Sequence, residues 1–133
     1  MKRILLATAG GVLYFLGFCG YEQFYLSWVC MVPALWALDS GSLGTRQALA
    51  TGLAFGAAAS LGIFYWIGHT LIVFGGLPAP AAVAGCLLFS VLQGGIMAIW
   101  AGAIHLLKSR RVPLYLISAP ALVVSEWFWP ALF

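Results

Sequence analysis

The most conspicuous deficit of the sequence is charge. Only 7% of the 133 residues are Asp, Glu, Lys or Arg, whereas 64% are apolar. Soluble domains carry about 25% charged residues, so this chain has too few to cover a surface that faces water. No charged residue occurs between Arg46 and Lys108. The composition therefore excludes an ordinary soluble domain and predicts an integral membrane protein.

Motifs for metal, nucleic-acid and catalytic chemistry are also lacking. The cysteines Cys19, Cys30 and Cys86 lie in or beside apolar runs and have neither CxxC nor Cys/His spacing. The formal net charge is +3, but the six cations form no basic stripe. A nucleophile elbow, an HExxH motif and a phosphate loop are absent from the sequence. We therefore assign no catalytic residue, and we expect no metal, no cofactor and no nucleic-acid partner.

Long apolar runs are what the sequence has instead. Backbone amides in lipid have to be paired internally, so each run predicts a helix. The expected fold is an all-α membrane protein, a single transmembrane helical module over residues 1–133 with about five spans. These spans cover residues 4–18, 24–38, 47–74, 80–107 and 113–133. The first two are shorter than the roughly 20 residues that cross a bilayer core, and we expect them to form a tight hairpin.

The positions of the cations give the expected orientation. Lys2 and Arg3 precede the first span, Arg46 separates the second from the third, and residues 108–111 separate the fourth from the fifth. With five alternating spans, all six cations fall on one side. The positive-inside rule places that side, and the N-terminus with it, in the cytoplasm. We expect the N-terminal run to be retained as a span, because Phe18 stands where a lipoprotein-processing box needs a small residue.

Two further patterns concern helix packing and the membrane interface. Gly52, Gly56 and Ser60 recur at helical spacing in the third span, which predicts the close approach of another helix. Aromatic residues gather at the expected outer ends of the spans: Tyr21, Phe24, Tyr25, Trp28, Phe64, Tyr65, Trp66, Trp127 and Trp129. An interfacial belt explains them, and the alternative is an aromatic-lined mouth that admits lipid chains between helices.

Three ionisable residues lie within the expected spans, where such groups are functional candidates. His69 and His105 lie near span ends, so exposure at the interface explains both. Glu126 lies beyond the middle of the fifth span. A carboxylate at that depth needs a partner, water or a proton, and His69 is the residue of this chain that could approach it. Glu126 is therefore interpreted as either functional or helix-organising.

Three motifs occur in a fixed order along the chain. The short hairpin contains Val32-Pro33-Ala34-Leu35, and the third span carries Trp66 and Thr70 before Phe74-Gly75-Gly76-Leu77-Pro78. The last run contains Ala119-Pro120-Ala121-Leu122, followed by Glu126. Over essentially the whole chain, this order and spacing resemble the N-terminal membrane region of bacterial apolipoprotein N-acyltransferases.

The resemblance implies a function that the residues alone do not. Members of the family transfer an acyl chain from a phospholipid to the N-terminal cysteine of a lipoprotein, at the outer face of the bacterial cytoplasmic (inner) membrane. Their chemistry belongs to a nitrilase-like domain with a Glu-Lys-Cys triad, which this sequence lacks. By resemblance, the chain is a multi-pass membrane module that is not catalytic alone. Its partners are phospholipid, lipoprotein and a catalytic domain supplied by a continuation of the chain or by a separate one.

The resemblance also selects candidate site residues. The candidates for a lipid or substrate entrance, or for organising helices, are Trp66, His69, Thr70, Phe74, Gly75, Gly76, Pro78 and Glu126. The chain departs from the family pattern after Glu126, where Phe128-Trp129-Pro130 replace an Arg and a Gly, and the last span has no polar flank. We therefore expect a truncated or split protein. The alternatives are a small oligomeric transporter or channel-like protein that uses Glu126 and His69, and an inactive remnant.

Overall fold

Every regular element in the described part of the chain is a helix. The computed structural model describes residues 1–18, 23–39, 41, 43–108 and 112–128. The helices are α1 (Lys2–Phe18), α2 (Leu26–Val29), α3 (Met31–Asp39), α4 (Thr45–Ile63), α5 (Trp66–Val73), α6 (Ala79–Lys108) and α7 (Leu114–Phe128). The expected all-α class is thereby confirmed. The predictions that concern Cys19, Tyr21, Arg110, Arg111 and residues 129–133 lie outside the described residues.

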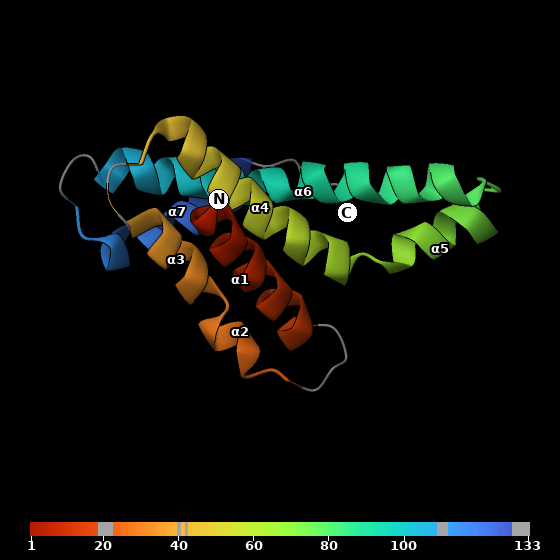
Figure 1. Cartoon of the computed structure of the whole chain (residues 1–133), viewed down its shortest axis with the longest axis horizontal. Coiled ribbons are helices and arrows are strands. Elements are labelled where there is room, and N and C mark those ends of the chain that lie inside the picture. The colour runs from red at the N-terminus through yellow and green to blue at the C-terminus, as the bar shows by residue number, and fades with distance from the viewer. Residues whose placement is uncertain (19–22, 40, 42, 109–111, 129–133) are drawn as a thin grey trace.

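The helix α4 lies at the centre of the packing, between α1 and α6 (Figure 1). Phe55 of α4 is fully buried, and its ring centroid lies 6.2 Å from that of Tyr14 on α1. Trp100 of α6 is also buried, and its Nε1 donates a hydrogen bond of 2.9 Å to the carbonyl oxygen of Ser118 on α7. The two aromatic side chains thus join α1, α4, α6 and α7 into one bundle.

Small residues set the distance between α4 and α6. A Cβ atom added to Gly56 would lie 2.7 Å from the Cα of Gly94, and one added to Gly52 would meet the carbonyl oxygen of Met97. Neither neighbour can move easily, because both belong to the backbone of α6. Ser60 continues the same stripe and is buried. The close packing predicted from Gly52, Gly56 and Ser60 is therefore confirmed, with α6 as the partner helix.

The expected continuous helix over residues 47–74 is interrupted. It divides into α4 and α5, which are bent by 56° relative to each other. Gly62 packs directly under the ring of Phe15 from α1, and the ring of Phe64 lies edge-on to Phe89 of α6, with centroids 5.1 Å apart. These contacts hold the end of α4 between two other helices. The chain resumes with turn-type hydrogen bonds from Ile67 to Phe64 and from Gly68 to Tyr65 before α5 continues.

The second expected span also consists of two pieces, α2 and α3. Pro33 lacks an N–H group, so the carbonyl of Val29 receives no hydrogen bond from it in the usual helical pattern. That loss falls at the boundary between the two helices, beside Cys30.

Among the described helices, α6 alone is long and apolar enough to cross a bilayer as one helix. It has 30 residues, which corresponds to about 45 Å at the usual rise of an α-helix. The bent pair α4 and α5 meets the same criteria if it forms a single broken span. The pieces over Leu26–Asp39 and Leu116–Phe128 are shorter apolar helices.

The described cations gather at one end of the bundle. Arg3 at the start of α1 donates a hydrogen bond of 3.1 Å to Oε1 of Gln47 at the start of α4. Lys108 at the end of α6 forms an ion pair of 2.6 Å with Asp39 at the end of α3. Arg46 lies beside Gln47 in the first turn of α4. Charges that are far apart in the sequence are thus neighbours in the fold.

The contact between α4 and α6 yields a test in which the same substitution is made at two glycines. We expect Gly56→Ala to lower the free energy of unfolding in detergent by about 1–3 kcal/mol, because its new methyl group meets the backbone of α6. Gly68→Ala in α5 is the matched control, since a Cβ at Gly68 has no neighbour within 4 Å. The control should be neutral or stabilising, because alanine favours helices. Equal destabilisation of both variants would contradict the assigned contact.

Candidate functional site

The family-like motif over residues 66–78 forms one arm of a helical hairpin. In Figure 1, α5 and the N-terminal part of α6 lie side by side and extend away from α1 and α3. Leu71 of α5 approaches Gly85 of α6, where an added Cβ would lie 3.1 Å from Leu71 Cδ1. The helix α5 has no buried residue. The motif is therefore displayed on an apolar arm rather than enclosed in the core.

One stripe of α5 carries three of the predicted site residues. Trp66, Thr70 and Phe74 are spaced four residues apart, which places them on the same side of the helix. Trp66 is exposed, and Phe74 at the C-terminal cap is 83% exposed. The Oγ1 of Thr70 donates a hydrogen bond of 3.2 Å to the carbonyl oxygen of Trp66. This internal bond satisfies the hydroxyl donor, so the stripe presents an almost entirely apolar surface.

The turn between α5 and α6 pairs its own backbone groups. The amide of Phe74 donates to the carbonyl of Thr70 at 2.9 Å, and the amide of Leu77 donates to that of Leu71 at 3.1 Å. Gly76 has φ +62°, a left-handed conformation that glycine adopts without steric cost. The carbonyl of Pro78 then accepts the first hydrogen bonds of α6, from Ala81 and Ala82. Such pairing lets a turn of apolar residues lie in or near lipid.

The structure places Glu126 on a different helix from the other candidates. It is exposed on α7, beside Trp127, which is 86% exposed. The helix α7 packs on the C-terminal part of α6 through Ile117, Ala121 and the bond from Trp100 to Ser118, whereas α5 packs on the N-terminal part.

The structure therefore does not pair Glu126 with His69. Both side chains are exposed, and neither forms a hydrogen bond or an ion pair within the described residues. His105 lies in the last turn of α6, far along that helix from the hairpin turn, and lines a small hollow with Lys108. The polar path that a transporter would need from Glu126 and His69 is not assembled by these helices.

The two described cysteines are occupied with packing and backbone contacts. Both Cys30 and Cys86 are buried. The Sγ of Cys30 lies 3.0 Å from the carbonyl oxygen of Ser27, and that of Cys86 lies 3.9 Å from the carbonyl oxygen of Phe64. Neither thiol stands next to the base and the cation that thioester chemistry requires. Within the described ranges, no group of three His, Cys, Asp or Glu residues could hold a metal ion.

The aromatic residues expected at the outer ends fall into two groups. The exposed group, as expected both for an interfacial belt and for a lipid-admitting mouth, consists of Phe24, Tyr25, Trp28, Tyr65, Trp66 and Trp127. Phe64 is different, because it is partly buried against Phe89 and fixes the end of α4.

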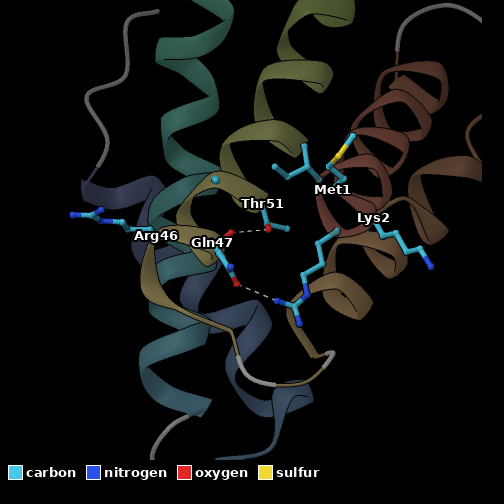
Figure 2. A pocket seen from close by; sticks show the side chains of 8 residues that line it. Met1, Lys2, Arg46, Gln47 and Thr51 are labelled. Atoms are coloured by element: carbon cyan, nitrogen blue, oxygen red, sulfur yellow. Dashed lines mark hydrogen bonds between the residues drawn. The ribbon is translucent and has the colours of Figure 1, made fainter.

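A hollow that the sequence does not predict lies at the N-terminal end of α4, away from α5. Arg3, Gln47 and Thr51 contribute to this hollow of about 530 Å³ between the first turns of α1 and α4 (Figure 2). In the sequence, α2 and α3 separate α1 from α4, so the sequence pattern gives the cations there only a role as markers of orientation. The sequence shows only that Lys2-Arg3 and Arg46 each stand at the start of an apolar run.

Comparison with known proteins identifies the family. Residues 10–133 match the family model described as the apolipoprotein N-acyltransferase N-terminal domain. No curated protein matches the chain, and neither does any solved structure. The match includes the hairpin arm with its Phe-Gly-Gly-Leu-Pro turn, the stripe of small residues and Glu126. Together with the apolar helix α6, it indicates a membrane protein related to lipoprotein acylation. Since this match covers most of the chain, the chain belongs to the apolipoprotein N-acyltransferase family and matches the N-terminal domain of that family.

Proposed function

We propose that the chain is the membrane-embedded N-terminal module of a lipoprotein N-acyltransferase that uses phospholipid as the acyl donor, and that it does not catalyse the transfer alone. The observation that carries this proposal is the exposed apolar hairpin, on which the family motif lies. Trp66 and Phe74 are exposed along one stripe, and the hydroxyl of Thr70 is already satisfied. Such a surface suits contact with acyl chains.

The chemistry of the described residues supports a module that does not catalyse the acyl transfer by itself. Acyl transfer through a thioester needs an accessible thiolate, a base and an oxyanion-stabilising group. Cys30 and Cys86 are buried, and their sulfurs lie against backbone carbonyl groups. The nitrilase-like catalytic domain would therefore be supplied by further sequence or by a separate chain. In this proposal, residues 1–133 form one module that holds the domain at the membrane and admits its lipid substrates.

The hairpin residues would act as the entrance for lipid. Trp66, Thr70 and Phe74 form its wall, His69 lies beside them, and the turn through Gly75, Gly76 and Pro78 forms its tip. Glu126 has a separate role in this proposal. Its carboxylate is exposed on α7 and would organise the contact with a later span or with the catalytic domain.

We further propose a bacterial inner-membrane location, five spans and a cytoplasmic N-terminus. In support, the described cations lie together at one end of the bundle, and the hairpin turn lies at the other end of α6. The pair α4 and α5 would be one broken span. The short α1 and the α2–α3 pair would form a hairpin that thins the bilayer locally.

This orientation predicts which positions a membrane-impermeant maleimide can reach in intact cells. In a background without the native cysteines, we expect Leu77→Cys, at the hairpin turn, to be labelled from outside once the outer membrane is permeabilised. Gly44→Cys, before α4, should be labelled only after the inner membrane is opened. Both positions are exposed on the surface of the bundle, and a side chain at Gly44 has no neighbour within 4 Å. Labelling of Gly44→Cys from outside would contradict the orientation.

The module's role predicts a chimera that is active where the chain alone is not. We expect no N-acylation of a diacylated lipopeptide by the isolated chain in phospholipid vesicles, because the described thiols lack catalytic partners. Replacing the matching N-terminal region of a complete apolipoprotein N-acyltransferase by this chain should preserve N-acylation. Mass spectrometry of the lipopeptide measures the product.

The controls separate the role of the hairpin from folding. Phe74→Ser in the chimera should slow acylation several-fold, whereas Val83→Ser, an equally polar change on an exposed side of α6, should act much less. Acylation by the isolated chain would contradict the non-catalytic role. An inactive chimera that is inserted and folded would contradict the proposal that the chain is an acyltransferase module.

A further inference from the structure

The hollow between the first turns of α1 and α4 has an unusual lining. Its volume is about 530 Å³, and the residues around it are Met1, Lys2, Arg3, Ile4, Arg46, Gln47, Ala50 and Thr51. Three of these residues are cations and none is acidic. Figure 2 shows Gln47 and Thr51 inside the hollow, with Lys2 and Arg46 on opposite sides of it. The hollow therefore concentrates positive charge at one end of the bundle.

Helix dipoles add to this charge. The first turn of a helix carries a partial positive charge, which favours acidic residues there and disfavours cations. Neither α1 nor α4 has an acidic residue in its first turn. Lys2 and Arg3 occupy that turn in α1, and Arg46 occupies it in α4. Gly44, the N-cap of α4, makes no side-chain cap bond. The positive ends of two helices and three cations thus reinforce one another.

The acidic side chain described at this end of the bundle pairs with a cation outside the hollow. Asp39 lies at the same end of the bundle, but its Oδ1 forms an ion pair with Nζ of Lys108. Arg3 is held in place by its hydrogen bond to Gln47 Oε1. Lys2 and Arg46 are exposed at the rim, where long side chains reorient quickly. One cation is therefore preorganised, and two others can turn towards an anion that enters.

The surroundings of the hollow indicate what kind of anion it receives. Ile4 lines the hollow and is 46% exposed, and Leu5 and Leu49 continue the exposed apolar surface on α1 and α4. Cations that border an apolar helical surface are the arrangement that binds anionic lipid headgroups. A guanidinium group matches the oxygen atoms of a phosphate particularly well.

We propose that this hollow binds the phosphate of an anionic phospholipid at the end of the bundle opposite the hairpin. The bound headgroup would lie among Arg3, Lys2 and Arg46, with its acyl chains along the apolar sides of α1 and α4. The lipid here is a structural ligand and not an acyl donor. The proposal does not depend on acyl transfer, so it can fail or succeed independently of the proposed function.

Native mass spectrometry of the full chain in a non-ionic detergent tests the proposal. The chain is mixed with equal amounts of phosphatidylglycerol and phosphatidylcholine, and the two bound lipids are counted. We expect a preference for phosphatidylglycerol. Removing two cations in Arg3→Gln/Arg46→Gln should lower that preference by about tenfold or more. The reason is that each Lys or Arg near an anionic lipid surface strengthens binding several-fold, and the two effects multiply.

Two matched variants distinguish a site from general attraction. Ala50→Trp keeps every charge but places a large ring in the hollow and narrows it, and it should also weaken the preference. Lys108→Gln/Asp39→Asn removes the ion pair at the same end of the bundle but outside the hollow, without releasing the Asp39 carboxylate, and it should retain the preference. Circular dichroism checks that each variant is folded. Arg46→Gln alone replaces an exposed side chain and provides a weaker form of the test if the double variant does not fold.

The source of the phosphate is decided by a competition arm. If inorganic phosphate at millimolar concentration removes the preference of the unsubstituted chain for phosphatidylglycerol, the hollow recognises phosphate itself and a soluble anion can occupy it. If it does not, the lipid is the ligand. An unchanged preference in Ala50→Trp, or an equal loss in Lys108→Gln/Asp39→Asn, would overturn the assignment of the hollow as the binding site.

Discussion

The close contact between α4 and α6 is the constraint on which the rest of the structure depends. At Gly52, Gly56 and Gly94 the two backbones approach so closely that no side chain fits between them. In lipid, exposed apolar surface has no driving force towards other apolar surface, so helices associate through close packing and hydrogen bonds. The glycine contact supplies that packing here. The helix α1 then packs on α4 and α7 packs on α6, which places the core around Phe55 and Trp100.

The same contact separates two chemically different ends. Because α6 continues for 30 residues and α4 ends at Ile63, the N-terminal part of α6 lies beside α5 and extends away from α1 and α3 (Figure 1). That end is apolar and carries the family motif. The other end collects the start of α1, the start of α4 and the end of α6, with their cations. Packing at a few glycines thus decides which charges become neighbours and which surface stays free for lipid.

The sequence predicted the class of fold and the family but not the bend or the basic hollow. The stripe of Gly52, Gly56 and Ser60 could be predicted from the sequence, because a small residue at every fourth position of one helix indicates the close approach of another helix. The break after Ile63 was not, since no proline or polar residue marks it. It depends on Phe15 over Gly62 and on Phe64 against Phe89, which are contacts between helices. The basic hollow was missed for the same reason, because Arg3 and Gln47 meet only in the folded chain.

The exposed hairpin has to be judged by the solvent that surrounds it. In water, Phe74 and its apolar neighbours would require a partner surface, and their exposure would indicate a missing subunit. In a bilayer, the same exposure has little cost, provided that polar groups are satisfied internally. The hydroxyl of Thr70 is bonded within α5, and the turn at Gly76 pairs amides of Phe74 and Leu77 with helix carbonyls. Because its polar groups are satisfied internally, the arm can contact mobile acyl chains without a protein partner, as the proposed entrance for lipid requires.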